Sequence, residues 1–269
     1  MKYLALVAAV CLLMVPSVAL AQQISPNPNP SGNTITVDTK YGDSSGDFDN
    51  YGTIDIKGNG TLWNDGTLRN EGAVINSGTG ETPREMGLIN HLRLINYGTL
   101  NNNGDMLNTR GGIMWNYGKV TNDGTFRNEG FVNMDTTWDN YGTLINTDLE
   151  YIYSTAFIVY GTGTLSNYYG GTLPNDGELS NYGRLNNHGT LTFESGSELS
   201  QRDLNTGETG TLTNASGGRI ESYVDDFYIA LTDSSDAIFV GGTVNLESGS
   251  TFANYANINI TSALKMQRD

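Results

Sequence analysis

Single apolar residues recur at six-residue steps along most of the chain, and each follows a fixed polar triplet. In most copies the second residue after the glycine of this triplet is Leu, Val, Ile, Phe or Met. Helix is excluded over these stretches, because an amphipathic helix needs apolar residues at intervals of about 3.6 residues and disfavours frequent glycine. The triplet Asn-x-Gly begins at Asn50, Asn64, Asn70, Asn76, Asn96, Asn102, Asn116, Asn122, Asn128, Asn140, Asn175, Asn181, Asn187 and Asn205.

A longer period lies over the hexad and predicts the fold. Tyr-Gly pairs recur at intervals close to three hexads, beginning at Tyr97, Tyr117, Tyr141, Tyr160 and Tyr182. We therefore predict an all-β chain that forms a single parallel β-solenoid (β-helix) of about 20-residue, three-faced coils built from Asn-x-Gly-x-Leu-x hexads. The apolar side chain should point inward, the glycine should turn the corner with positive φ, and stacked asparagines should form amide ladders along the axis.

Residues 1–21 have the pattern of a secretory signal peptide. Lys2 precedes an apolar run, and Ala19-Leu20-Ala21 is a small-residue cleavage site. The single cysteine, Cys11, lies inside this segment, so we expect no disulfide and no thiolate metal site in the rest of the chain. No second long apolar run follows, which predicts no membrane span after signal cleavage and a secreted, extracellular or cell-surface location.

The rest of the chain divides by the regularity of its hexads. Residues 22–49 read as an extended N-terminal segment that serves as a cap or as a donor strand for a neighbouring molecule. Residues 50–214 read as regular solenoid with insertions near 77–95 and 148–160. Residues 215–269 read as a less regular continuation with a C-terminal cap.

Charge and motif content argue against several classes of function. The net charge is −15, and the 14 basic residues are scattered, so nucleic-acid binding is not expected. The sequence has no nucleophile elbow and no phosphate loop, and its two histidines, His91 and His188, lie far apart. We therefore predict no enzyme, no catalytic residue and no organic cofactor. A polysaccharide lyase or hydrolase is the alternative, with a mixed-charge group near the first insertion as its candidate: Arg84, Glu85, His91 and Arg93.

The densest acidic cluster is a weak calcium candidate. Calcium prefers carboxylate and carbonyl oxygens, and a solvated acidic loop is the competing interpretation. The cluster consists of Asp225, Asp226, Asp233 and Asp236.

Aromatic and threonine rows are further candidates for surface sites. If the coils stack in register, tyrosines that share one hexad position form an outward ladder, which either stiffens the rod or provides a platform for sugar rings. That ladder comprises Tyr51, Tyr97, Tyr117, Tyr141 and Tyr182. A row of threonines that follow the glycines indicates an ice-binding face as a third, weaker alternative: Thr53, Thr67, Thr99, Thr125, Thr143 and Thr190.

Repeats such as the stretches 64–68 (NDGTL) and 140–144 (NYGTL) resemble those of filamentous-haemagglutinin and autotransporter-passenger β-helices over roughly residues 50–255. The resemblance concerns architecture and implies a cell-surface or secreted adhesin or structural rod. We expect a non-enzymatic extracellular protein that forms homopolymers through its solenoid ends or its N-terminal segment, or that binds a glycan or another cell-surface ligand. A carbohydrate-binding or polysaccharide-degrading β-helix is the alternative.

Overall fold

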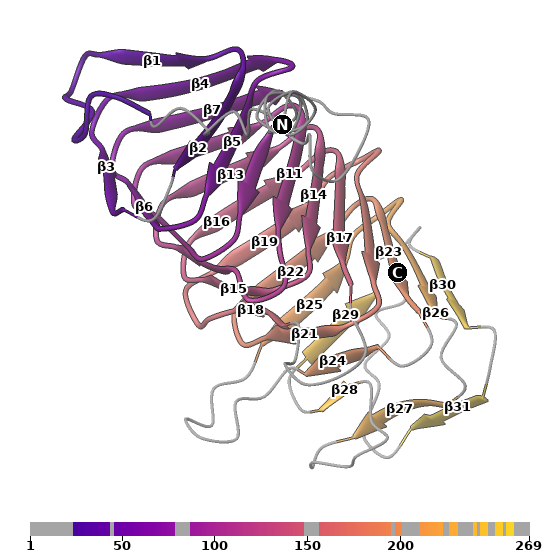
Figure 1. The fold of residues 1–269 in the computed structure, drawn as a ribbon. Coiled ribbons are helices and arrows are strands. Elements are labelled where there is room, and N and C mark those ends of the chain that lie inside the picture. The colour runs from indigo at the N-terminus through magenta and orange to yellow at the C-terminus, as the bar shows by residue number, and fades with distance from the viewer. Residues whose placement is uncertain are drawn as a thin grey trace, which may run out of the picture.

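The computed structural model describes residues 24–43, 46–78, 87–147, 156–194, 197–200, 210–222, 226–230, 239–240, 243–246, 251–254 and 257–260. The signal segment 1–21, with Cys11, lies outside these residues. Within them the chain winds through successive short strands into a stack of coils (Figure 1). Among the described residues there is no helix long and apolar enough to cross a membrane.

Every third strand joins the same parallel sheet, which makes three long faces. Sheet I has the order β1 (Thr34–Val37), β4 (Thr53–Gly58), β7 (Ala73–Gly78), β10 (Thr99–Asn102), β13 (Lys119–Asn122), β16 (Thr137–Asn140), β19 (Thr164–Asn167), β22 (Arg184–Asn187), β25 (Thr211–Asn214), β29 (Thr243–Leu246). Sheet II has the order β2 (Lys40–Asp43), β5 (Thr61–Asn64), β8 (Leu88–Asn90), β11 (Asp105–Asn108), β14 (Thr125–Asn128), β17 (Thr143–Asn146), β20 (Thr172–Asn175), β23 (Thr190–Phe193), β26 (Arg219–Ser222), β30 (Thr251–Asn254).

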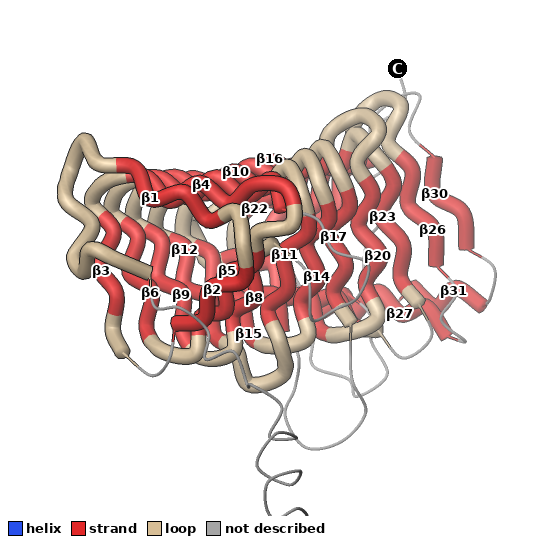
Figure 2. Tube along the Cα trace, turned by 45° about the horizontal axis from the view of Figure 1, so that its top comes forward, coloured by secondary structure: helices blue, strands red, loops and turns tan. Residues whose placement is uncertain are grey.

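Sheet III closes each coil. Its order is β3 (Phe48–Asn50), β6 (Thr67–Asn70), β9 (Arg93–Asn96), β12 (Ile113–Asn116), β15 (Phe131–Met134), β18 (Ala156–Val159), β21 (Glu178–Asn181), β24 (Glu198–Ser200), β28 (Phe239–Val240), β27 (Asp226–Ala230), β31 (Asn257–Ile260). The tube view shows the three faces and the turns that separate them (Figure 2). The predicted three-faced parallel β-solenoid is thus confirmed.

Most strands are four residues long, and their second and fourth residues point inward. In β13, for example, Val120 and Asn122 are at most 1 % exposed, whereas Lys119 is exposed. The apolar second residues of successive coils pack into one continuous core. Around Trp138 this core contains large aromatic side chains, because the indole makes edge contacts with Phe126 and Phe157 at ring-centroid distances of 4.9 and 5.2 Å.

The inward asparagines at the strand ends form three amide ladders, one inside each corner. At the corner between sheets III and I, Nδ2 of each asparagine donates to Oδ1 of the next, through Asn29, Asn50, Asn70, Asn96 and Asn116, at 2.7–2.8 Å. The corner between sheets I and II has a second ladder from Asn76 to Asn214, and the corner between sheets II and III has a third from Asn64 to Asn175. The ladders satisfy amides that would otherwise be buried at a cost of about 1–3 kcal/mol each.

Hexad glycines are needed for close stacking of the coils. A Cβ on Gly118 would overlap the carbonyl oxygen of Gly98 in the preceding coil, and one on Gly98 would overlap that of Gly72. Positive φ occurs instead at Gly32, Gly58, Gly111, Gly170 and Gly217 among the described residues. The expectation that each hexad glycine turns its corner with positive φ is therefore wrong. The constraint comes from the neighbouring coil, where backbone meets backbone.

Regular strands lie within the stretches interpreted as insertions. The range 77–95 includes β8 and the start of β9, and the range 148–160 includes β18. Residues 79–86 and 148–155 themselves lie outside the described part of the chain. Near the C-terminal end the order changes, since β28 lies between β24 and β27.

Candidate functional site

The outer surface of each corner carries the residue that follows the ladder asparagine, so successive coils stack these residues in a column. At the corner between sheets III and I, the backbone N–H group of each column residue donates to a backbone carbonyl oxygen one coil earlier. That carbonyl belongs to the ladder asparagine or to the residue that stands in its place. This III–I column consists of Tyr51, Glu71, Tyr97, Tyr117, Asp135, Tyr160 and Tyr182. It contains four of the five tyrosines that the sequence analysis proposed as a ladder.

The fifth tyrosine lies at another corner. Tyr141 follows Asn140 of sheet I and belongs to the I–II column, where the next members are Tyr168 and His188. The Tyr141 and Tyr168 rings stack at 4.4 Å with 7° between their planes, and His188 continues the column at 6.0 Å from Tyr168. His188 is thus an outward corner residue in an aromatic stack.

Ring stacking uses the aromatic faces that a sugar would need. Tyr97 and Tyr117 are 5.2 Å apart with 16° between their planes, and both are about half exposed. A sugar ring packs its C–H face on an open aromatic face, whereas this pair presents mainly its edges and hydroxyl groups to solvent. Tyr51 makes no such stack because Glu71 follows it in the column, and Tyr160 and Tyr182 are tilted by 59°.

Two carboxylates shape the electrostatics of these columns. Desolvation raises the pKa of Asp135, and burial together with the negative charge of Asp135 raises the pKa of Tyr117. On the outer face of sheet I, Lys119 pairs with Asp139 at 3.1 Å, and this hydrogen-bonded ion pair raises the pKa of the lysine. The Lys119–Asp139 pair connects the adjacent strands β13 and β16.

The acidic cluster lies mostly outside the described part of the chain. Asp225, Asp233 and Asp236 lie outside the described residues, and Asp226 begins β27 without a described side chain. Across the described ranges, no group of three or more His, Cys, Asp or Glu side chains is arranged to hold a metal ion. Calcium binding by this cluster stays a prediction.

Only half of the mixed-charge group lies in the described part of the chain. Arg84 and Glu85 lie outside the described residues. His91 is at the II–III corner, where its Nδ1 lies 3.3 Å from the Thr109 hydroxyl, and Arg93 is on the outer face of sheet III. A site formed by this group stays a prediction.

The threonine row is distributed over all three faces. Thr125, Thr143 and Thr190 share a register on sheet II with Thr172, whereas Thr53 and Thr99 are on sheet I and Thr67 is on sheet III. Only the sheet II members form an aligned rank.

The outer faces of sheets I and III differ sharply over the same coils. On sheet I the outward residues are polar: Thr99, Asn101, Lys119, Thr121, Thr137, Asp139, Thr164 and Ser166. On sheet III one outward row consists of Arg93, Ile113, Phe131 and Ala156, and the other of Ile95, Trp115, Asn133 and Ile158. We call these eight residues the sheet III patch.

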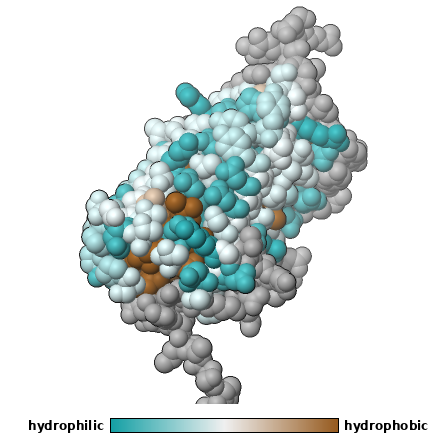
Figure 3. All heavy atoms as spheres, turned by 90° about the horizontal axis from the view of Figure 1, so that it is seen from above, coloured by the Kyte–Doolittle hydropathy of each residue, from teal (hydrophilic) through white to brown (hydrophobic). Residues whose placement is uncertain are grey.

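Sequence reasoning did not find the sheet III patch. The signal was present, because Ile113, Trp115 and Phe131 are large apolar residues at variable hexad positions that should point to solvent. Seen from above, most of the described surface is hydrophilic or intermediate, and strongly hydrophobic residues gather in a limited area (Figure 3). In the sheet III patch, Arg93 is exposed, Ile95 and Ala156 are buried, and the other five members are partly buried.

No protein-family model matches the chain, and no curated protein is similar to it in sequence.

Proposed function

We propose that the protein is a secreted, non-enzymatic structural or adhesive rod at the cell surface or outside the cell, and that it assembles end to end. The observation that carries the proposal is the set of three amide ladders, which run parallel to one another inside a continuous core. Such ladders contribute axial regularity and stiffness without creating a reactive group. The signal-like segment 1–21 supports export.

The polarity of the stack supports assembly through its ends. All strand pairs among the described residues are parallel, and each ladder amide donates toward the C-terminal coil. One end of a solenoid of this kind is therefore complementary to the other end of a second copy. Among the described residues, β1 pairs with β4 alone. The strand of the N-terminal segment thus forms the first rung of sheet I, and we propose that its outer edge receives the neighbouring molecule.

Electron microscopy of edge variants tests the proposal. The purified protein should form filaments or long end-to-end rods in negative stain, with a matching early peak in size-exclusion chromatography. The double variant Thr34→Lys/Thr36→Lys places charge on two exposed positions of β1 and should give single rods, because charged residues discourage edge pairing. The control Thr99→Lys/Thr121→Lys changes outward positions on internal strands of the same sheet and should still assemble. Single rods from the unmodified protein at all concentrations would contradict end-to-end assembly.

A further inference from the structure

Two pairs of tyrosines stack face to face at the outer corners of the solenoid. In the III–I column, the rings of Tyr97 and Tyr117 have their centroids 5.2 Å apart, with 16° between their planes. In the I–II column, Tyr141 and Tyr168 are 4.4 Å apart, with 7° between their planes. Each pair joins two successive coils, because its members follow consecutive ladder asparagines.

The phenol groups of a pair point the same way. The backbone N–H group of each of these tyrosines donates to the ladder asparagine one coil earlier, so both rings leave equivalent positions of the corner. Desolvation raises the pKa of Tyr141, and the proximity of Tyr168, which includes a hydrogen bond between the two side chains, raises it further. With nearly parallel rings and neighbouring hydroxyl groups, the ring carbons ortho to the two hydroxyl groups lie close together.

These rings are accessible from solvent without unfolding. Tyr97 is 51 % exposed, Tyr117 is 42 % exposed and Tyr141 is 43 % exposed, whereas Tyr168 is partly buried. Since the ring faces cover each other, the exposed part of a pair consists mainly of ring edges and hydroxyl groups. An external oxidant can therefore reach the phenols in the folded protein.

Each pair is separated from the other tyrosines of its column. Glu71 precedes Tyr97 and Asp135 follows Tyr117, so the nearest other tyrosines are two coils away, which corresponds to about 10 Å at ordinary strand spacing. In the I–II column Asp123 precedes Tyr141, and His188 follows Tyr168. The only tyrosine next to each member within its column is thus its stacked partner.

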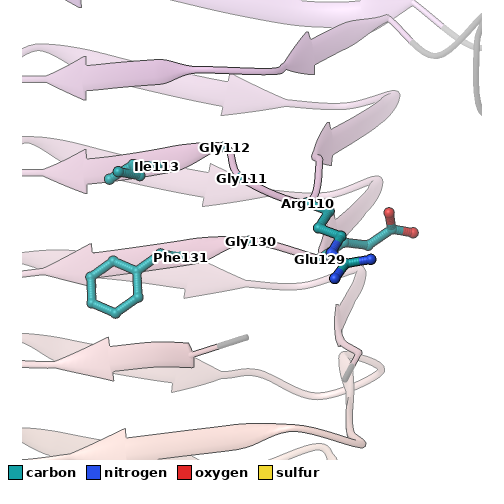
Figure 4. A pocket seen from close by; sticks show the side chains of 7 residues that line it. All are labelled: Arg110, Gly111, Gly112, Ile113, Glu129, Gly130 and Phe131. Carbon is teal, nitrogen blue, oxygen red and sulfur yellow. The ribbon is translucent and has the colours of Figure 1, made fainter. Parts of the chain in front are cut away.

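The third corner has no such pair. Figure 4 shows Arg110 and Glu129 at the II–III corner, beside the groove that Gly111, Gly112 and Gly130 line. Among the described residues, the corner residues whose N–H groups donate to the asparagines of that ladder include no tyrosine: they are His91, Thr109, Glu129, Thr147, Asp176 and Glu194.

We propose that Tyr97–Tyr117 and Tyr141–Tyr168 are sites of oxidative cross-linking, at which a haem peroxidase and hydrogen peroxide join each stacked pair as dityrosine. Each phenol loses one electron and one proton to give a phenoxyl radical. The two radicals form a carbon–carbon bond between their ortho carbons, and the protons on those carbons move to the ring oxygens as the rings become aromatic again. In total two electrons and two protons leave the pair, and they reduce one peroxide molecule to two water molecules.

The product would join successive coils covalently at two corners. Tyr97 would be linked to Tyr117, and Tyr141 to Tyr168, within one chain. Such links restrict the unfolded chain as a disulfide does, in a protein whose only cysteine is in the signal segment. The reaction takes place on the outer corners and not at the solenoid ends, so the proposal holds or fails independently of end-to-end assembly.

Treatment of the purified protein with a haem peroxidase and hydrogen peroxide tests the proposal. Dityrosine fluorescence should appear in the band that runs as a single chain on a denaturing gel. Trypsin cleaves after Arg110, between Tyr97 and Tyr117, so mass spectrometry should find the peptides 94–110 and 111–119 joined with the loss of two hydrogen atoms. The peptide 128–184, which contains the second pair, should also lose two hydrogen atoms.

Phenylalanine variants assign each cross-link, because they keep the stacked ring and remove the phenol. Tyr97→Phe should abolish the joined peptides 94–110 and 111–119 and leave the change in 128–184, whereas Tyr141→Phe should do the reverse. The double variant Tyr97→Phe/Tyr141→Phe should lose the single-chain fluorescence. The matched control Tyr160→Phe/Tyr182→Phe alters neighbouring tyrosines of the III–I column whose rings are 6.0 Å apart and tilted by 59°, and should keep it.

Three results would overturn the proposal. The first is dityrosine that occurs only in bands of two or more chains, which would assign the reaction to contacts between molecules. The second is equal loss of fluorescence in the control and in the double variant. The third is the absence of dityrosine when the peroxidase oxidises free tyrosine in the same solution.

Discussion

Asn96 donates from Nδ2 to Oδ1 of Asn116 at 2.7 Å, and both side chains are at most 1 % exposed. Asn96 also accepts from Asn70 and donates to the carbonyl oxygen of Lys119 at 3.3 Å. Asn96 therefore joins three coils, and the loss of its amide removes a hydrogen bond from each of two buried neighbours.

Substitution of one ladder amide should destabilise the fold far more than substitution of an exposed asparagine. We expect Asn96→Ala to lower the free energy of unfolding by about 2–4 kcal/mol, because buried donors and acceptors lose their partners. Asn103→Ala, at an exposed corner position, should change it by less than about 0.5 kcal/mol. Urea denaturation followed by circular dichroism measures both. Equal effects would mean that the ladder contributes little.

Substitutions at the glycines should differ in their effect on stability, and the sign of φ should not predict which are tolerated. Gly118→Ala should destabilise by about 1–3 kcal/mol or prevent folding, because the new methyl group overlaps the backbone of Gly98 and Tyr97. Gly111 has φ of +86° with open space around it, so Gly111→Asn should be nearly neutral, since asparagine tolerates this region. Thermal unfolding of the two variants distinguishes stacking from backbone conformation. A more stable Gly118→Ala than Gly111→Asn would contradict the stacking argument.

The hydroxyl group of Thr136 takes the place of a ladder asparagine and should stabilise the fold. Asn116 Nδ2 donates to Thr136 Oγ1 at 3.2 Å, and that hydroxyl donates to the carbonyl oxygen of Gly118. Thr136→Val keeps the shape and removes both hydrogen bonds, so we expect a loss of about 1–3 kcal/mol, whereas Thr136→Ser should retain most of the stability. Thr137→Val, at an exposed position, is the matched control in the same denaturation experiment.

Asp135 should lower the free energy of unfolding as pH rises. A salt-bridged carboxylate has the opposite effect. Desolvation raises its pKa in the folded state above the ordinary value of 3.8, so folding favours the protonated form. The resulting penalty is absent below pH 3.8 and grows as pH rises through the folded pKa. Asp135→Asn should therefore be more stable than the unmodified protein at pH 7, and the difference should shrink toward pH 3.5. A constant difference across this range would contradict the assignment.

The fold could be predicted from the sequence because the same hexad recurs at every corner. Each hexad places one apolar residue and one asparagine on the inner side of a strand. Tyr141 shows where such reading fails. It follows Tyr117 by 24 residues, four hexads instead of three, and so falls on the next corner. Coil length varies, since successive ladder asparagines are 18 residues apart at Asn122 and Asn140 but 29 apart at Asn146 and Asn175.

Features that depend on contacts between coils were not readable from the local pattern. The role of Gly118 depends on the position of Gly98 one coil earlier, and the sheet III patch exists only because Ile113, Trp115 and Phe131 come to one face. Once each hexad has been assigned to a corner, the position of Gly118 beside Gly98 and the members of the sheet III patch can be derived from the residue numbers.

Fibre diffraction from aligned assemblies of the purified protein tests the central proposal most directly. If the rods join end to end through their sheets, strand spacing continues along the filament, and a reflection near 4.8 Å should lie on the meridian. A 4.8 Å reflection on the equator, or the absence of any ordered assembly, would show that the solenoid axes do not run along a common filament and would contradict the proposed function.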